Sequence, residues 1–193
     1  MTTAHADLPM TFTYADARRL GLSDRRLHGL VADGAVYRLG RGVYRRSDAP
    51  LADDDLIEVA AKAPDATLAL LSAAHRHDLT DRIPTRLDVA LPRSQRAPQV
   101  NAAVRWHRFD EATWQVGRGR LDVGDGFAIG LYDAERTLVD LFRLRHLEGD
   151  DVAVEALKRW LRRPGSVPAT LLGVARRFPS AEPSLRAALQ VLL

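Results

Sequence analysis

Residues 13–46, TYADARRLGLSDRRLHGLVADGAVYRLGRGVYRR, decide the fold of this chain. Thr13 and Ser23 are residue types that favour the N-cap position, so each predicts the start of a helix. Gly21 and Gly34 can adopt the left-handed conformation that ends a helix. The stretch therefore predicts a helix, a tight turn, a second helix ending near Asp33, and a hairpin. This is the order of elements in a winged helix-turn-helix.

The second predicted helix has one apolar and one basic surface. Leu27, Leu30 and Val31 share a face by the three-and-four spacing of an amphipathic helix. The other side combines small and basic residues: Arg25, Gly29 and Ala32, flanked by Arg26 and His28. Small residues let a helix enter the DNA major groove while an arginine reaches a base edge or a phosphate. We expect the basic side chains to address the major groove; the alternative is an ordinary solvated helix.

The hairpin adds a second basic feature. Residues 35–39 and 43–45 read as short strands joined by Gly40, Arg41 and Gly42. Two glycines around an arginine predict a mobile basic tip, suited to phosphate or the minor groove. We expect Arg38, Arg41 and Arg45 to make these contacts, and a plain surface hairpin is the alternative.

The net charge of the chain lies in the same region. The sequence has 28 Lys plus Arg against 25 Asp plus Glu, a formal net charge of +3. Residues 1–50 hold eight arginines and five aspartates, whereas residues 51–193 hold 20 charges of each sign. The whole excess therefore falls in the segment predicted to read DNA, where release of counterions would supply affinity.

Two longer stretches resemble a known family. FTYADARRLGLSDRRLHGLVADGAVYRLGRGVYRR (residues 12–46) and LYDAERTLVDLFRLR (residues 131–145) are similar to AbiEi-family antitoxins and related transcriptional regulators. The resemblance implies an N-terminal winged helix that represses its own operon in a type IV toxin-antitoxin system. It also implies a C-terminal domain that supports neutralisation of a nucleotidyltransferase-like toxin.

The chain departs from that family's pattern at one place. Such domains usually carry a helix before the one that starts at Tyr14, and residues 1–10, with Pro9 near the end, are too few for a full core helix. We expect that either this sequence starts late or another segment covers that face.

The rest of the chain predicts a mixed domain after a polar break at residues 47–50. Three acids at 53–55 suggest the N-terminus of a helix rather than a metal cluster. We expect a helical stretch over 66–77, strands over 87–91, 104–109 and 127–132, and several helices from Asp133 onward. Arg136 is expected to make a fixed hydrogen-bonded contact inside the domain.

The sequence shows no convincing catalytic or cofactor motif. It has no Gly-x-Ser-x-Gly, no His-Glu-x-x-His and no phosphate-binding glycine loop, and it contains no cysteine. We therefore expect no enzyme activity, no metal and no cofactor. Since it also lacks an apolar run of membrane-spanning length, we expect a cytoplasmic protein without membrane contact.

The sequence thus predicts an α+β protein with a winged helix at 11–47 and a second domain at 51–193. The second domain is expected to have a small β-sheet and a helical C-terminal portion. We expect a DNA-binding antitoxin whose partners are double-stranded DNA at its own promoter and a nucleotidyltransferase-like toxin. The alternatives are a stand-alone regulator whose C-terminal domain senses a ligand or dimerises, and a DNA-processing enzyme with a winged-helix targeting domain. The oligomeric state does not follow from the sequence.

Overall fold

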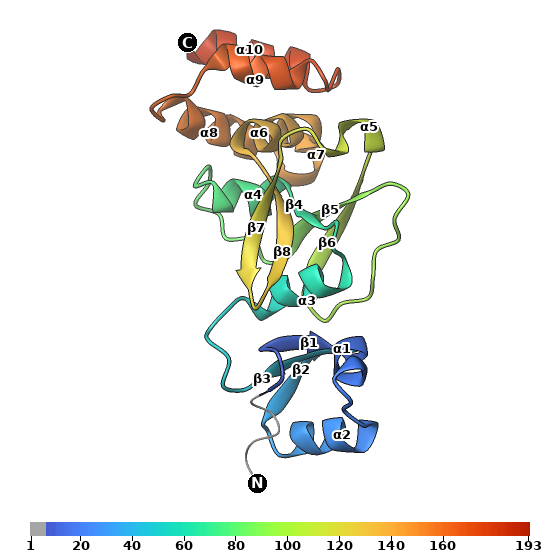
Figure 1. Ribbon diagram of the computed structural model, residues 1–193. Helices are drawn as coiled ribbons and strands as arrows, with labels where there is room; N and C mark the ends of the chain where they lie inside the picture. Colours follow the sequence, from blue (N-terminus) through green and yellow to red (C-terminus); the bar gives the residue numbers. More distant parts are fainter. Residues whose placement is uncertain (1–6) are drawn as a thin grey trace. The chain divides into compact units, whose positions relative to one another are not determined.

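The computed structural model describes residues 7–193 and has the mixed α+β architecture that the sequence predicts (Figure 1). The chain divides into two compact units. The first contains the residues up to 64 together with 98–103 and 122–129, and the second contains 65–97, 104–121 and 130–193. Each unit is described by itself below.

The first unit contains the predicted helix, turn, helix and hairpin. Its elements, in chain order, are β1 (Thr11–Thr13), α1 (Tyr14–Arg19), α2 (Asp24–Ala32), β2 (Val36–Gly40), β3 (Val43–Arg46) and α3 (Asp54–Lys62). The strands form an antiparallel sheet in the order β1-β3-β2, so β3 is the middle strand. We call residues 36–46, which form β2, β3 and the turn between them, the wing.

Local capping explains where the first two helices of this unit, α1 and α2, begin. The Thr13 side chain accepts a hydrogen bond from the backbone N–H of Asp16, whose carboxylate accepts one from the Thr13 N–H. This reciprocal pair is a capping box. The Ser23 hydroxyl caps α2 by accepting from the Arg26 N–H, and Gly21 has a φ of +79° in the turn that precedes it. The predicted caps are confirmed.

The core of the first unit includes residues from the segment before β1. Its buried side chains come from both helices, the sheet and the residues before β1: Leu8, Phe12, Ala17, Leu22, Leu27 and Val36. Leu8 and Phe12 are 5% and 1% exposed. The segment that leads into β1, together with β1 itself, therefore contributes to this core.

The compact unit is larger than the 11–47 domain that the sequence predicts. It includes α3 and the segments 98–103 and 122–129, which come from much later in the chain. The compact units are not separated at residue 50, so a functional boundary at that residue stays a prediction.

The second unit is a mixed sheet with helices. Its elements are β4 (Thr67–Leu68), α4 (Leu70–Arg76), β5 (Leu87–Pro92), β6 (Val104–Phe109), α5 (Glu111–Trp114), β7 (Arg118–Gly124), β8 (Phe127–Tyr132), α6 (Ala134–Arg143), α7 (Arg145–Glu148), α8 (Asp150–Leu161), α9 (Pro168–Ala175) and α10 (Glu182–Leu192). The strand order is β6-β5-β4-β8-β7. β4 pairs antiparallel with β5 and parallel with β8. The ends of β7 and β8 that meet at residues 125–126 belong to the first unit.

The helical stretch predicted over 66–77 is wrong in its first part. Residues 67 and 68 form β4, because they hydrogen-bond between β5 and β8, and the helix α4 begins only at Leu70. The two strands that flank β4 come from later in the chain, so no local pattern predicts the pairing.

The helix α6 is the centre of the second unit and packs against α4, α8, α9 and α10. Asp133 caps it, as predicted, by accepting from the Arg136 N–H. The Arg136 side chain is fully buried and donates to Asp140 at 2.9 Å and to the carbonyls of Thr113 and Val116 at 2.7 and 2.8 Å. The predicted internal contact of Arg136 is therefore confirmed.

Candidate nucleic-acid interface

The helix α2 buries its apolar side and leaves its basic side in solvent. Leu27 is 4% exposed and lies in the core, and Leu30 and Val31 pack partly buried against it. Arg25, Arg26 and His28 are exposed. The helical spacing in the sequence therefore placed all three side chains correctly on the solvent side.

Within residues 7–193, acidic side chains do not pair with the exposed basic residues of α2. The side chains of Arg25, Arg26 and His28 have no ion pair or hydrogen bond with any residue in the described range 7–193. Side chains that are not engaged within the protein remain available to phosphates or base edges. This makes α2 the strongest candidate for a groove-reading element in the first unit.

The wing presents two of the three arginines expected there. Arg41 is exposed in the turn between β2 and β3, next to Gly42, whose φ of +75° requires glycine or a strained residue. Arg38 is exposed on β2, and its Nε donates to the carbonyl of Gly40 at 3.1 Å. Arg41 has no partner among the described residues, whereas Arg38 is oriented by its own strand.

The mobility expected of the wing tip stays a prediction, and the structure shows two hydrogen bonds that hold the tip. The N–H of Tyr14 donates to the carbonyl of Gly42, and the Asn101 amide donates to the carbonyl of Leu39, both at 2.8 Å. A Cβ on Gly40 would lie 1.7 Å from the Glu58 carboxylate, so this glycine permits close packing. The tip is held on both sides, which fixes where Arg41 projects.

Glu58, which lies close to Gly40 of the wing, is a buried carboxylate that accepts several hydrogen bonds. It accepts from the Asn101 and Ala102 backbone N–H groups at 2.8 and 2.9 Å and from Lys62 at 2.8 Å. Burial alone would raise the pKa of Glu58, but these hydrogen bonds and the Lys62 charge outweigh it, so the pKa is lowered. Glu58 is therefore ionised at neutral pH.

The expected DNA contact of Arg45 is wrong, because this residue is buried. Its Nε donates to Asp125 at 2.9 Å, its Nη1 lies 3.1 Å from both Asp54 and the Tyr37 hydroxyl, and its Nη2 donates to the Pro50 carbonyl. Only 4% of its side chain is exposed. Successive side chains of a strand point to opposite faces of the sheet. Tyr44 packs on the core, so its neighbour Arg45 points to the other face of β3.

Residues of α1 next to α2 were not singled out from the sequence. Tyr14 and Arg18 lie four residues apart, which places them on one side of α1. The Tyr14 hydroxyl donates to Asp24 at 2.8 Å, and Arg18 lies 3.7 Å from the same carboxylate and donates to the Leu22 carbonyl at 2.9 Å. The four-residue spacing was the only available signal, and it does not reveal the partner.

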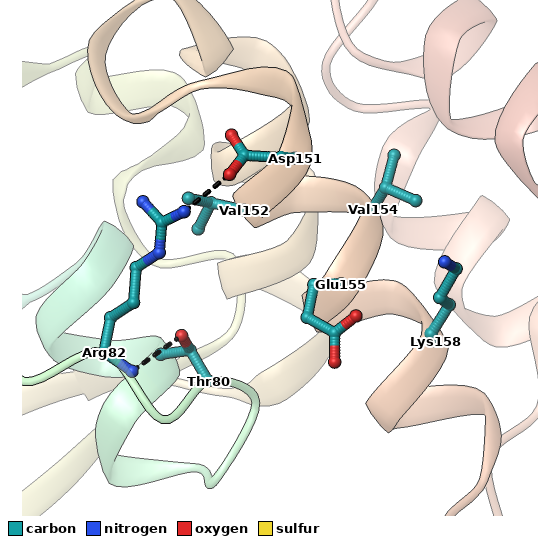
Figure 2. A pocket seen from close by; sticks show the side chains of 7 residues that line it. All are labelled: Thr80, Arg82, Asp151, Val152, Val154, Glu155 and Lys158. Carbon is teal, nitrogen blue, oxygen red and sulfur yellow. Dashed lines mark hydrogen bonds and ion pairs between the residues drawn. The ribbon is translucent and has the colours of Figure 1, made fainter.

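The second unit has a polar surface pocket of about 400 Å³ beside α8. Figure 2 shows Arg82 paired with Asp151 of α8, with Glu155 and Lys158 following along the same helix. Thr80 lies at the base of the Arg82 loop, where its hydroxyl accepts from the Arg82 N–H at 3.1 Å. Charges of both signs alternate around this pocket, so it suits a small polar ligand better than a nucleic acid.

Two further searches of the described residues are negative. Within residues 7–193, no group of three or more histidine, aspartate or glutamate side chains is placed to hold a metal ion. None of the helices in this part of the chain combines the length and apolar composition needed to cross a bilayer.

The N-terminal segment is similar to a described family. Residues 3–47 match the family described as "Transcriptional regulator, AbiEi antitoxin", which confirms the resemblance expected from the sequence. No curated protein matches this chain in sequence. The crystal structure of the RV2827C protein from Mycobacterium tuberculosis is similar, with a TM-score of 0.53 and 18% identity, over 97% of this chain and 77% of that one. At this identity the likeness supports the α+β fold alone.

Proposed function

We propose, from the premise that residues 3–47 are those of an AbiEi antitoxin regulator, that this protein binds specific DNA and represses its own operon. We further propose that it counteracts a nucleotidyltransferase-like toxin encoded with it. In this proposal α2 reads the major groove and the wing contacts the phosphate backbone. The chain itself is proposed to carry out no catalysis.

The observation that carries the DNA-binding proposal is a set of basic side chains, on adjoining elements of one compact unit, that make no ion pair within residues 7–193. Arg25, Arg26 and His28 project from α2, and Arg41 projects from a wing tip that the Tyr14 N–H and Asn101 hold in place. Basic side chains on a helix and on a neighbouring wing favour binding to duplex DNA. The burial of Arg45 removes one expected contact and leaves the others unchanged.

A binding titration on an operator duplex and a scrambled duplex tests the separate roles of the two elements. Arg25→Ala should weaken operator binding by about 1–3 kcal/mol and relax sequence preference, because it removes a base contact. Arg41→Ala should weaken binding to both duplexes alike and lower the salt slope by about 1, because it removes a phosphate contact.

The matched control is Arg162→Ala, which removes an exposed arginine at the C-cap of α8 in the second unit. It should leave both affinities unchanged. The proposal fails if the wild-type protein does not prefer its own promoter, or if Arg25→Ala and Arg162→Ala behave alike on both duplexes.

The toxin-neutralising role is tested by co-expression. A neighbouring nucleotidyltransferase-like gene should be toxic alone and harmless together with this protein. Absence of rescue would leave DNA binding in place and remove the antitoxin role.

A second candidate, a stand-alone regulator that senses a ligand, is favoured by the pocket beside α8. A regulator of this kind would release its operator when a small polar ligand is added. Operator binding that no ligand alters, combined with toxin rescue, would decide against this alternative.

A further inference from the structure

The starts of α1 and α2 and the wing tip all meet at one residue, Tyr14. Tyr14 is the first residue of α1, directly after the cap Thr13, which pairs with Val43 of the wing. Its backbone N–H donates to the carbonyl of Gly42 at 2.8 Å, and its Cβ would lie 3.9 Å from a Cβ on Gly42. The main chain of Tyr14 thereby fixes the tip of the wing to the start of α1.

The side chain of Tyr14 makes the other half of the connection. Its hydroxyl donates at 2.8 Å to Asp24, the first residue of α2. This bond raises the pKa of the Tyr14 phenol above its ordinary value, so the hydroxyl keeps its proton and remains a donor throughout the neutral range. Tyr14 is nonetheless 43% exposed, and burial of its ring in the core does not account for its position.

The Tyr14–Asp24 bond also matters electrostatically. Asp24 lies beside Arg25 at the N-terminus of α2, the end that a reading helix turns toward DNA. An uncompensated carboxylate at that end would repel phosphate. The Tyr14 hydroxyl donates a hydrogen bond to this carboxylate, and the more distant Arg18 partly compensates its charge; both residues belong to α1.

We infer that Tyr14 is a positioning residue for DNA recognition, which sets the α2 helix and the wing tip in register with one another through its hydroxyl bond to Asp24 and its N–H bond to Gly42. The inference rests on the proposed DNA-binding function and deepens it. Tyr14 acts on specificity through the placement of Arg25, without reading a base itself.

The first test is hydrogen exchange in the free, full-length protein, which needs no DNA. Tyr14→Phe and Asp24→Ala should each speed exchange of the α2 amides, and the double variant should be no faster than Asp24→Ala alone, because Asp24→Ala already removes the Tyr14 bond. The control Tyr37→Phe removes a similar bond, from the Tyr37 hydroxyl to Asp54 at 2.9 Å, in the same unit. It should leave α2 exchange unchanged.

The second test measures operator and scrambled duplex with the same variants. Tyr14→Phe should lower the ratio of operator affinity to scrambled affinity about fivefold, the effect of one hydrogen bond, with the salt slope unchanged. Tyr37→Phe should keep the ratio. An equal loss on both duplexes, or no change in either exchange or ratio, would overturn the inference.

The two proposals fail in different ways. If the wild-type protein does not select its operator, the proposed function fails, and the exchange experiment alone then shows whether Tyr14 holds α2. If the wild-type protein selects its operator and Tyr14→Phe does so equally well, only the role of Tyr14 is lost.

Discussion

The replacement Asp125→Asn tests how the first unit is held together. One oxygen of Asp125 accepts from Arg45 Nε at 2.9 Å and from the Thr11 hydroxyl at 2.7 Å. The side chains of Arg45 and Asp125 are 4% and 8% exposed, so the pair is buried. Asparagine keeps the size of the side chain and tolerates the positive φ of +56° at this position, which isolates the effect of the lost charge.

The expected loss follows from which partners remain. Removing one partner of a buried ion pair costs about 3–5 kcal/mol. Arg45 retains Asp54 at 3.1 Å, but that carboxylate is 41% exposed and screened by solvent. We therefore expect Asp125→Asn to reduce the free energy of unfolding by about 2 kcal/mol, a drop in the thermal midpoint of about 4–8 °C for a chain of this size.

Urea unfolding followed by far-UV circular dichroism gives this free energy, and hydrogen exchange assigns the loss to β1–β3. Asp122→Asn is the control, because Asp122 is exposed on the same hairpin and accepts only from the nearby Gly124 N–H. Arg45→Met combined with Asp125→Asn should recover much of the loss, since no buried charge is then left unpaired. A loss below about 0.5 kcal/mol for Asp125→Asn alone would refute the reasoning.

Three further predictions concern buried groups in both units. Gly40→Ala should cost about 1–3 kcal/mol in urea unfolding, because the new Cβ displaces the Glu58 carboxylate from its donors. Asp140→Asn should cost about 3–5 kcal/mol, measured by urea unfolding with tryptophan fluorescence, because it leaves the buried guanidinium of Arg136 and the partly buried one of Arg143 without their counter-ion. Burial would raise the pKa of Asp88, but hydrogen bonds from His107 and the neighbouring arginine of β6 outweigh it and lower the pKa below 3.8. Asp88 therefore stabilises the fold above pH 3.8 and loses this effect as the pH falls through its lowered value, so Asp88→Asn should flatten the acid limb of an unfolding titration.

The parts of the fold that the sequence predicts are those fixed by near neighbours. The capping residues Thr13, Ser23 and Asp133 bond to backbone groups three residues away, so their pattern is visible in the sequence itself. The solvent side of α2 follows in the same way from helical spacing, which is why Arg25 is where the sequence placed it.

The parts that escaped prediction depend on residues distant in the chain. Arg45 reads as a surface arginine because its partner Asp125 comes 80 residues later. The strand β4 has only two residues, and its neighbours β5 and β8 supply all its pairing. The bond from Tyr14 to Asp24 depends on how α1 and α2 cross, which the sequence does not state. In the candidate interface, the sequence therefore predicted which side chains of α2 are exposed. It did not predict the hydrogen bonds and ion pairs that hold α2 and the wing in place.

The first unit is built from segments that are separated in the sequence, and this has a consequence for synthesis on the ribosome. The unit is complete only when residues 122–129 are present, which is about two thirds of the way along the chain. Because domains fold as their residues emerge, a nascent chain that has passed only Pro50 lacks the Asp125 carboxylate that pairs with Arg45 in the complete unit. If the proposed repressor function is correct, alleles with stop codons between positions 51 and 121 should therefore not repress the promoter, and no released fragment should act as a competing repressor.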